Sequence, residues 1–468
     1  MDARKLMGLL GGLIMLAALH AWSVATHTQR ISATGDAESL RTLPHRLVRP
    51  DFTADAHVWI RLAEETAVHG NLRVRKTQID NAPAGREVHW NSAYVWWLRL
   101  GGEARRAVTG EPLSHAIEAW ALWANLPLFA IILTGLAWWT ARRAGVFAGT
   151  LVAIAVFGHR FLYSGFWPGN ADHHGLIGAT LVAMGLGAWW MREGLGAETA
   201  DEKARAISSA RWSGVWGGVG LWLSAATTVP AIMAVALASG LGVVFGRRAE
   251  SGAGCLPAVW RSWGRWGAAT SAVFYLAEYA PSHLGWRLEV NHPLYALAWW
   301  GGAELMAVTL PFVVGERAKK DGRPWGHTAL WALPCVAAPV VAVAVGGARV
   351  FAPLDPFMAG VHETILEFLS IGARWKVEGL AFNYEVLLVV PVFMLAGGWA
   401  VTRRDVERGG VVFALALLVV AEVLACWQAR WTLSTLVGQL VLLLAILGWK
   451  PEENDQWWRR ATVLGLLV

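Results

Sequence analysis

Apolar and polar positions along this chain alternate in long blocks. Apolar runs of roughly 17–25 residues recur, which is the length that crosses a bilayer core as an α-helix. Short segments that carry charges separate these runs. The pattern predicts an all-α polytopic membrane protein with about thirteen transmembrane helices, of which the last begins near Ala461 and is incomplete.

Basic clusters predict the orientation of the helices, because the cytoplasmic loops of membrane proteins are enriched in lysine and arginine. If Arg4 and Lys5 lie inside, each later dense basic cluster also falls inside. Two large external loops result, residues 26–114 and residues 348–383. We therefore expect one transmembrane domain, residues 1–468, with no soluble C-terminal domain after it.

Two local features of the apolar pattern need interpretation. The first run, Leu6–Leu19, fits a signal peptide with cleavage near Ala25. A retained helix is favoured, because the alternation of inside and outside loops needs a span there. Between the fifth and sixth spans we expect a short turn at Thr227–Pro230.

Composition supports the membrane class. Only 16% of the residues are charged, whereas a soluble protein carries about a quarter. The net charge of +6 does not indicate a nucleic-acid partner, because the basic residues fall in the short clusters that membrane orientation explains. The cysteines Cys255, Cys335 and Cys426 have no metal-like spacing and imply no disulfide framework.

Acidic residues on the expected outer side are the first candidates for chemistry. Asp55 opens an amphipathic helical stretch, where it either caps the helix or holds a divalent cation at the membrane surface. Asp172, His173 and His174 lie together at the start of the fourth span. A cap is again the alternative for Asp172, but carboxylate and imidazole together suit Mn²⁺ or a similar cation.

Two further elements lie at later outside loops. Glu367 ends the string Thr364–Glu367, and a solvated surface is the simpler interpretation of the ionisable cluster beside it, Asp355, His362 and Glu363. Arg430 stands at the outer mouth of a helix pair. It either extends to the membrane interface or pairs with phosphate oxygens, which a guanidinium binds well.

Taken in order, these four elements resemble the catalytic subunit of oligosaccharyltransferases of bacterial type, which have the family-C glycosyltransferase fold. That family has thirteen spans, with large outside loops after the first and the ninth. Asp55–Arg61 matches the spacing of its first acidic motif, and Asp172–His174 takes the place of its second. Thr364–Glu367 matches the T-I-x-E string of bacterial members, and Arg430 stands where the family has an arginine on the donor pyrophosphate.

The resemblance implies an enzyme that moves a glycan from a polyprenyl-diphosphate carrier to a protein acceptor, with Mn²⁺ or Mg²⁺ as cofactor. It implies metal ligation by Asp55, Asp172, His174 and Glu367, catalytic contacts of Asp55 and Glu367 with the acceptor, and donor-phosphate binding by Arg430. It also implies a bacterial inner membrane with a periplasm-facing site. Further candidate substrate contacts stand beside these motifs: His173, Arg61, His89, Trp90 and His292.

The sequence departs from the family at three points. His174 replaces the second acid of the second motif, and Arg160 is only a displaced counterpart of a family arginine. No W-W-D-Y-G string and no following soluble domain are found. A truncated chain, an acceptor other than an asparagine sequon, or recognition by another protein would each explain this last departure.

Two alternative functions remain open. One is a glycosyltransferase that uses a polyprenyl-monophosphate sugar and acts on a lipid or glycan. The other is a membrane transporter, which is disfavoured because the ionisable residues noted above cluster at outer boundaries rather than at mid-membrane depth.

Overall fold

The computed structural model describes residues 3–33, 53–79, 81–194, 197–245, 256–285, 287–313, 325–350, 357, 360, 365–379, 383–403 and 407–447. The described residues are mainly helical, as predicted, and their only sheet has two short antiparallel strands. The chain forms two compact units, Met1–Leu176 and Ile177–Val468, which are described separately.

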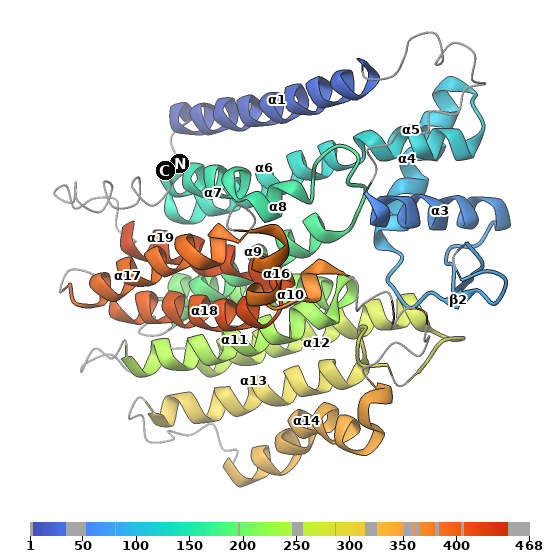
Figure 1. Cartoon of the computed structure of the whole chain (residues 1–468). Coiled ribbons are helices and arrows are strands. Elements are labelled where there is room, and N and C mark those ends of the chain that lie inside the picture. Colours follow the sequence, from blue (N-terminus) through green and yellow to red (C-terminus); the bar gives the residue numbers. More distant parts are fainter. Residues whose placement is uncertain are drawn as a thin grey trace. The chain divides into compact units, whose positions relative to one another are not determined.

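Among its described residues the first unit has seven α-helices, the last of them a single short one, and a two-stranded hairpin. Figure 1 shows these elements following one another along the chain. These elements are α1 (Ala3–Ala33), α3 (Ala54–His69), β1 (Lys76–Thr77), β2 (Arg86–Glu87), α4 (Ala93–Thr109), α5 (Leu113–Trp123), α6 (Asn125–Ala144), α7 (Val146–Gly158) and α8 (Arg160–Ser164). Helix α1 packs against α6 and α7, and His20 Nδ1 on α1 lies 2.8 Å from the Tyr163 hydroxyl on α8.

Much of the first predicted external loop is a folded helical region. Helices α3, α4 and α5 pack together around an apolar core that includes Trp59, Leu62, Tyr94 and Leu98. Apolar residues recur on one face of α3 and α4, so that each helix buries that face against the others. This core holds the polar residues of the loop in defined places.

The predicted second span is a bent pair of helices. Helices α5 and α6 meet at Ala124 with an angle of 42° between them. Pro127 follows directly, and its ring nitrogen cannot donate the hydrogen bond that would otherwise reach back across the break. The bend therefore falls where the helical hydrogen bonding is interrupted.

The second unit contains the long helices from α9 onward (Figure 1). Its elements are α9 (His174–Met191, which starts in the first unit), η1 (Arg192–Gly194), α10 (Ala200–Leu223), α11 (Ala225–Phe245), α12 (Leu256–Tyr279), α13 (Pro293–Val313), α14 (Trp325–Gly346), η2 (Gly347–Val350), η3 (Leu366–Phe368), α16 (Ile371–Glu378), the π-helix η5 (Glu385–Val389), α17 (Val390–Val401), α18 (Arg408–Trp427), η6 (Ala429–Ser434) and α19 (Thr435–Leu447). Helices α10, α12, α13 and α14 pack in sequence, and α18 packs against α11, α17 and α19.

The break between the fifth and sixth spans lies three residues before the predicted turn. Helix α10 ends at Leu223 and α11 begins at Ala225, and α11 continues through Pro230. Ser224 adopts an extended backbone between them, and its hydroxyl accepts a hydrogen bond from the Thr227 N–H at 3.4 Å. The expected turn at Thr227–Pro230 is therefore wrong. The break lies at Ser224, which caps α11, and Pro230 lies inside that helix.

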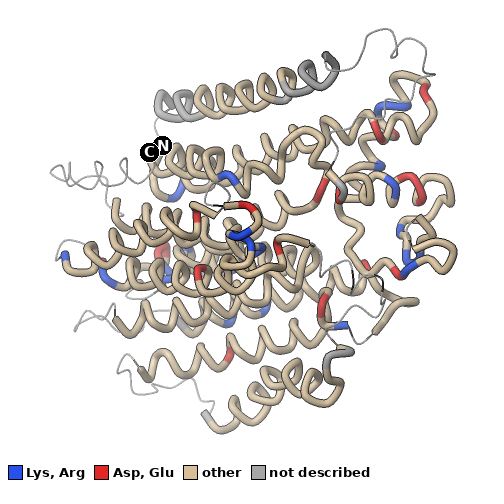
Figure 2. The backbone as a smooth tube through the Cα atoms, viewed as in Figure 1, with Lys and Arg blue, Asp and Glu red and all other residues tan. Residues whose placement is uncertain are grey.

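Six described helical segments are long and apolar enough to cross a membrane, and the bent α5–α6 pair would make a seventh. Figure 2 shows long stretches without charged residues along helices of the second unit. Several other predicted spans fall on helices that are shorter or more polar, so the total of thirteen stays a prediction. The six segments are His174–Met191, Ala225–Phe245, Pro293–Val313, Gly326–Gly346, Arg408–Trp427 and Ala429–Leu447.

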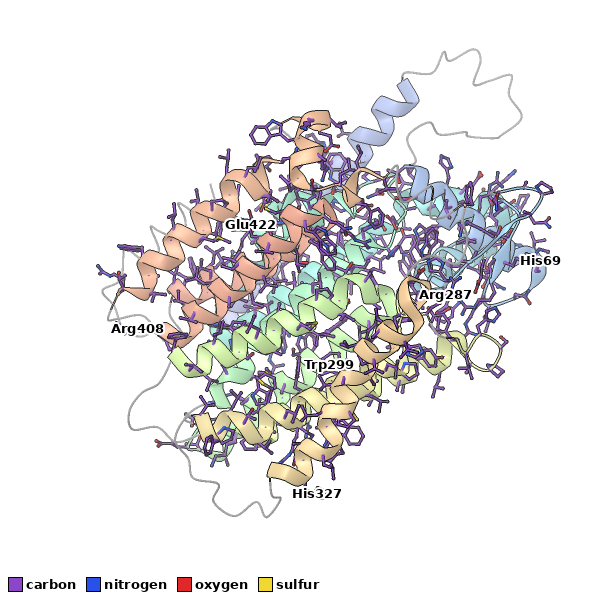
Figure 3. All side chains as sticks on the ribbon, turned by 60° about the horizontal axis from the view of Figure 1, so that its bottom comes forward. His69, Arg287, Trp299, His327, Arg408 and Glu422 are labelled. Atoms are coloured by element: carbon purple, nitrogen blue, oxygen red, sulfur yellow. The ribbon has the colours of Figure 1, made fainter. Side chains whose placement is uncertain are left out.

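Two glycines make room for one buried indole in the second unit. Trp299 on α13 is 4% exposed and lies among the helices, as Figure 3 shows. A Cβ at Gly217 of α10 would lie 2.5 Å from its ring, and a Cβ at Gly267 of α12 would lie 2.6 Å from it. Both distances are below van der Waals contact, so the three helices approach this closely only with glycine at both positions.

We expect Gly267→Ala to lower stability, because the new methyl group collides with the Trp299 ring, and overpacking costs about 1–3 kcal/mol. Gly302→Ala is the matched control. Its Cβ would meet its nearest atom, on Val336, at 3.8 Å, and alanine gains about 1 kcal/mol of helix propensity over glycine. Thermal unfolding of the two purified variants tests this, and equal shifts in Tm would contradict the packing described.

Candidate functional site

The Asp172 carboxylate and two imidazoles form a compact cluster in the first unit, which we call the aspartate–histidine cluster (Asp172, His173 and His174). Asp172 is 3% exposed and lies just before α9. Its Oδ2 pairs with Nδ1 of His174, and its Oδ1 accepts the backbone N–H of His173. Nδ1 of His173 lies 2.9 Å from the same carboxylate but does not have the angle of a hydrogen bond.

The charge of Asp172 is maintained by these neighbours. Burial alone would raise the pKa of its carboxyl, but the Coulombic attraction of His174 and His173 and the hydrogen bond from the His174 ring outweigh burial and hold the pKa well below its usual range. The cap interpretation of Asp172 is not what the structure has. Its carboxylate accepts the N–H of the next residue, whereas a cap would accept one from the first turn of α9.

The start of α3 lies beside the loop that carries this cluster. Thr53 is the N-cap of α3, and its hydroxyl accepts the Ala56 N–H at 3.3 Å. The Thr53 hydroxyl also donates to Oδ1 of Asn170 at 3.1 Å, and the Thr53 N–H donates to the Gly169 carbonyl oxygen at 3.2 Å. Asp55 is therefore not the cap. It lies in the first turn of α3 with an exposed side chain, where its negative charge suits the helix N-terminus.

Sequence reasoning missed a buried polar network that supports this loop. The Tyr94 hydroxyl donates to Oδ1 of Asn125 at 2.7 Å, and Nδ2 of Asn125 donates to the carbonyl oxygens of Asn170 and Gly165. Burial and the charge of Asp172 raise the pKa of the Tyr94 phenol well above its usual value, so the hydroxyl stays a donor. A lone asparagine inside an apolar run was the signal that could have revealed it.

Aromatic side chains surround the cluster. The His173 ring meets Trp59 edge to face at 4.7 Å, and Trp59 stacks on Trp90 at 5.8 Å. His89 contacts Trp90 in turn, and the Arg86 guanidinium lies over the Trp90 ring at 5.0 Å. Three predicted substrate contacts, His173, His89 and Trp90, are thus brought into one group.

Arg61 lies apart from that group. It pairs with Glu64 one turn along α3 at 2.8 Å, and its side chain is 53% exposed. An exposed pair of this kind contributes little to stability.

In the second unit, residues from two distant segments meet. Arg430 of η6 lies over the Phe368 ring at 4.7 Å, and Glu367 of η3 interacts with it by an attractive Coulombic force. The Ala429 N–H donates to the Leu369 carbonyl oxygen at 3.0 Å, which joins the two segments. The structure therefore brings Glu367 and Arg430 together. Thr364, the first residue of the matched string, lies outside the described residues.

His292 occupies a different place in the second unit. It precedes α13, and its Nε2 lies 3.0 Å from the Gly285 carbonyl oxygen while Nδ1 accepts the Leu294 N–H at 3.2 Å. Burial lowers the pKa of this imidazole, against the opposing effect of the Gly285 carbonyl. Both ring nitrogens thus have backbone partners, which indicates a structural contribution to the turn before α13.

Acidic residues also occur inside the predicted spans, which sequence reasoning overlooked. Glu385 of η5 is 6% exposed and accepts a hydrogen bond from Nε2 of Gln439 at 2.7 Å. Glu422 lies on α18 (labelled in Figure 3), and Sγ of Cys426 approaches its Oε1 at 3.9 Å. Ionisable residues in spans usually mark functional or tightly paired positions. These two glutamates are therefore further candidates for functional residues, after those of the matched motifs.

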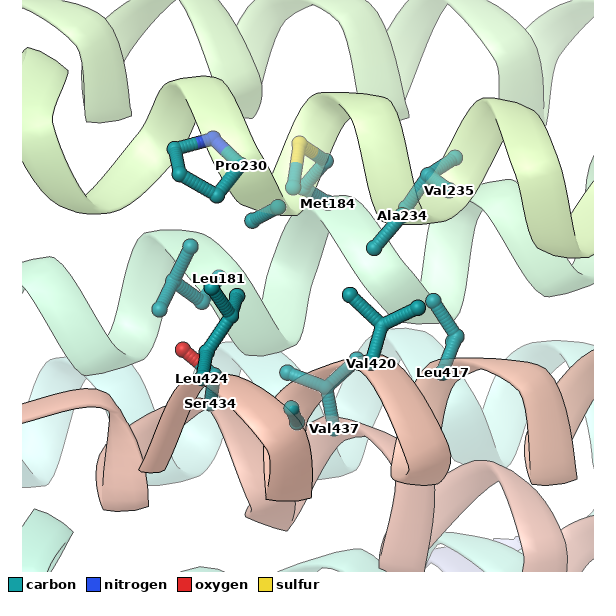
Figure 4. A pocket seen from close by; sticks show the side chains of 12 residues that line it. Leu181, Met184, Pro230, Ala234, Val235, Leu417, Val420, Leu424, Ser434 and Val437 are labelled. Carbon is teal, nitrogen blue, oxygen red and sulfur yellow. The ribbon is translucent and has the colours of Figure 1, made fainter. Parts of the chain in front are cut away.

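Two apolar hollows lie in the second unit. One is a narrow cleft of about 30 Å³ between α9, α11, α18 and η6–α19, lined by side chains such as Leu181, Pro230 and Ser434 (Figure 4). It is too small for a lipid chain. The other, of about 810 Å³, is lined by α14 and by Arg287, labelled in Figure 3. Its size and apolar lining suit a hydrocarbon chain.

The donor atoms of the aspartate–histidine cluster fit the metal that the resemblance implies. A buried carboxylate and a buried His173 Nδ1 without a hydrogen bond are the ligand types that Mn²⁺ accepts. Within the described ranges, no three His, Cys, Asp or Glu side chains converge in an ion-binding arrangement. In this structure both imidazoles lie against the Asp172 carboxylate.

Comparison with known proteins shows the fold. No protein-family model and no curated protein sequence matches the chain. The apo oligosaccharyltransferase of Archaeoglobus fulgidus matches with a TM-score of 0.60 at 15% identity, over 98% of this chain and 54% of that chain. The same organism's AglB, in complex with an inhibitory peptide and a dolichol-phosphate, gives 0.58 at 15% identity, over 99% and 54%.

The Archaeoglobus fulgidus enzyme tethered to an acceptor peptide with an NVT sequon gives a TM-score of 0.56 at 15% identity, over 98% of this chain and 53% of that one. This chain thus has the fold of these oligosaccharyltransferases along nearly its whole length, and it spans about half of theirs. The fold expected from the resemblance is confirmed, and a bacterial type stays a prediction.

We expect Tyr94→Phe and Asn125→Ala each to lower the free energy of unfolding, because each leaves a buried polar group without its partner, at a cost of about 1–3 kcal/mol. The double variant should lose less than the sum, since both changes remove the same Tyr94–Asn125 hydrogen bond. Denaturation in mixed micelles measures the three values. Strict additivity would show that the two side chains do not interact.

Proposed function

We propose that this chain is a membrane glycosyltransferase of the oligosaccharyltransferase type, which transfers a glycan from a polyprenyl-diphosphate donor to a protein. The observation that carries the proposal is the fold likeness, with TM-scores of 0.60, 0.58 and 0.56 along nearly the whole chain. Structures of that archaeal enzyme with a dolichol-phosphate and with an acceptor peptide support a lipid-linked donor and a peptide acceptor here.

Arg430 is assigned to the donor phosphate. A guanidinium presents a planar set of N–H donors that matches phosphate oxygens, and the Phe368 ring supports one face of this group. Its interaction with Glu367 limits the directions in which it can point. Arg430 would therefore stabilise the negative charge that grows on the leaving diphosphate.

Glu367 and Asp55 are assigned to the acceptor. In a direct displacement, the bond between the sugar anomeric carbon and the phosphate oxygen breaks as the acceptor nucleophile forms its bond to that carbon. The nucleophile loses one proton, and a carboxylate that accepts its hydrogen bond can take this proton. Asp55 is exposed and Glu367 is half-buried, so neither residue is enclosed in the protein core.

Asp55, Asp172 and His174 of the first unit would supply ligands to a divalent cation, Mn²⁺ or Mg²⁺. Such a cation adds positive charge that stabilises an anionic leaving group. The chain's own contribution is to hold Asp172 ionised and in place, through its histidine partners and the Tyr94–Asn125 network below the loop. The short basic loops support a site on the outer face of the membrane. The resemblance to bacterial members makes this the periplasmic face of an inner membrane in our proposal.

We expect Asp55→Ala, Asp172→Asn and Glu367→Ala each to reduce glycan transfer by about 100-fold or more, a loss typical of removing one transition-state contact. Matched controls are Glu103→Gln, which removes an exposed charge paired with Arg99, and Asp201→Asn in the first turn of α10. Transfer from extracted polyprenyl-linked glycans to protein in membranes, with and without Mn²⁺, is the measurement. Both controls should stay within about twofold of wild type.

The donor panel in this assay separates the competing functions. Transfer from a monophosphate sugar to a lipid, with no protein product, would replace the proposal by the alternative glycosyltransferase. Wild-type rates in all three site variants would refute the site. No transfer from any donor would favour a transporter.

We expect Arg430→Gln to raise the KM for the donor by about 10- to 100-fold, because a hydrogen bond to a charged group contributes about 1.5–3 kcal/mol. Arg430→Lys keeps the charge but loses the planar guanidinium, so its donor KM should lie between those of wild type and Arg430→Gln. Lys376→Gln on the nearby α16 is the control, since Lys376 is an exposed basic residue of the same region. An unchanged donor KM in Arg430→Gln would remove this residue from the donor site.

A further inference from the structure

A basic hollow in the second unit is separate from every residue assigned above. Its volume is about 450 Å³, and it lies between α10 and α12. Three arginines line it: Arg211 from α10, and Arg261 and Arg265 from α12. Trp266 and Ile207 supply apolar surface beside them.

The described ion pairs connect the two arginines of α12 to one buried carboxylate. Arg261 Nε pairs with Oε2 of Glu304 at 2.9 Å, and Arg265 Nη2 lies 3.7 Å from Oε1 of the same carboxylate. Glu304, on α13, is 3% exposed and is the one acidic residue that the described ion pairs bring to these arginines. Among the described ion pairs, the Glu304 carboxylate is therefore shared by two of the three arginines.

The sequence around each arginine adds no further acid. On a helix, charges three or four residues away are the ones that interact. For Arg211 these positions hold Ile207, Ser208, Gly214 and Val215. Arg261 and Arg265 are themselves four residues apart, so their like charges repel and destabilise α12 by themselves. An anion in the hollow would offset this repulsion.

The hollow exists because the two helices nearly touch just beyond it. A Cβ at Gly214 of α10 would lie 2.6 Å from the Trp263 carbonyl oxygen and 2.9 Å from the Gly267 nitrogen, both on α12. The crossing is therefore fixed by backbone contact close to the arginines. Arg211 and Arg265 are each within three residues of this crossing.

The chemistry of the occupant follows from these features. Guanidinium groups from two helices are suited to bind several phosphate oxygens together. The Trp266 side chain is 47% exposed, and interfacial tryptophans favour the headgroup level of a bilayer. Both helices begin after loops that the basic clusters place on the cytoplasmic side, where anionic lipids attract basic residues.

We propose that this hollow binds the phosphate of an anionic phospholipid, with its acyl chains along α12 beside Trp266. Arg211 and Arg265 bind the lipid phosphate, and Glu304 holds Arg261 in position beside it. The site is independent of glycan transfer. The anionic lipid would be retained by residues of α10 and α12.

Native mass spectrometry of the purified full chain tests this with phosphatidylglycerol and phosphatidylcholine of the same acyl chains. We expect wild type to retain phosphatidylglycerol preferentially, and Arg211→Gln and Arg265→Gln each to weaken its binding by about fivefold. Both variants keep the Arg261–Glu304 pair, so the fold should persist, and thermal unfolding checks this. Arg142→Gln, an exposed arginine in the last turn of α6, is the matched control and should retain the lipid as wild type does.

Three results would overturn the proposal. The first is equal retention of the two lipids by wild type. The second is equal phosphatidylglycerol binding by wild type, Arg211→Gln and Arg265→Gln, or an equal loss in Arg142→Gln, which would indicate only a diffuse basic surface. The third is displacement of the lipid by an equal concentration of glycerol phosphate, which would identify a site for a free phosphate anion.

Discussion

A carboxylate buried in an apolar helical protein must be given a partner, because its desolvation costs several kcal/mol even after the protein relaxes. Each of the most buried acids described here has one. Asp172 is paired with His174, Glu304 with Arg261, and Glu385 with Gln439. The last two pairs join different helices, so they also determine which faces of those helices meet. Breaking either pair would leave a charge or a polar group inside the protein without compensation.

The same constraint separates the two kinds of site. Asp172 has partners adjacent in the chain, so the aspartate–histidine cluster is assembled by local structure and only supported by the network from Asn125. Arg430 depends instead on a segment more than sixty residues earlier in the chain, which reaches it through the Ala429–Leu369 hydrogen bond. The first arrangement should persist whenever the loop forms. The second requires the outer segment to pack on α18 and η6.

The helices could be predicted well from the sequence, because the length of an apolar run reports directly on a membrane-crossing helix. Details decided by single side chains could not. The turn was expected at Thr227–Pro230, but the chain breaks at Ser224, whose hydroxyl accepts the Thr227 N–H. In the same way Asp55 was weighed as a helix cap, whereas Thr53 holds that position.

For the candidate site, adjacency along the chain predicted the Asp172 cluster, whereas only the family resemblance assigned Glu367 and Arg430 to the enzyme site at all. Residues outside the matched motifs were missed. Asn125 and Tyr94 look like ordinary members of apolar runs until their hydrogen bond is seen. The arginines of the basic hollow stand singly in the sequence, and only the packing of α10 on α12 brings them together.

The indole of Trp299 lies against two glycines that belong to two other helices. The side-chain sizes at three positions far apart in the chain therefore constrain one another during evolution. A lineage that replaces Trp299 by a small residue is released from glycine at 217 and 267, whereas a lineage that keeps the indole is not. Among relatives of this chain, these three positions should co-vary, with large residues at one accompanied by glycine at the other two.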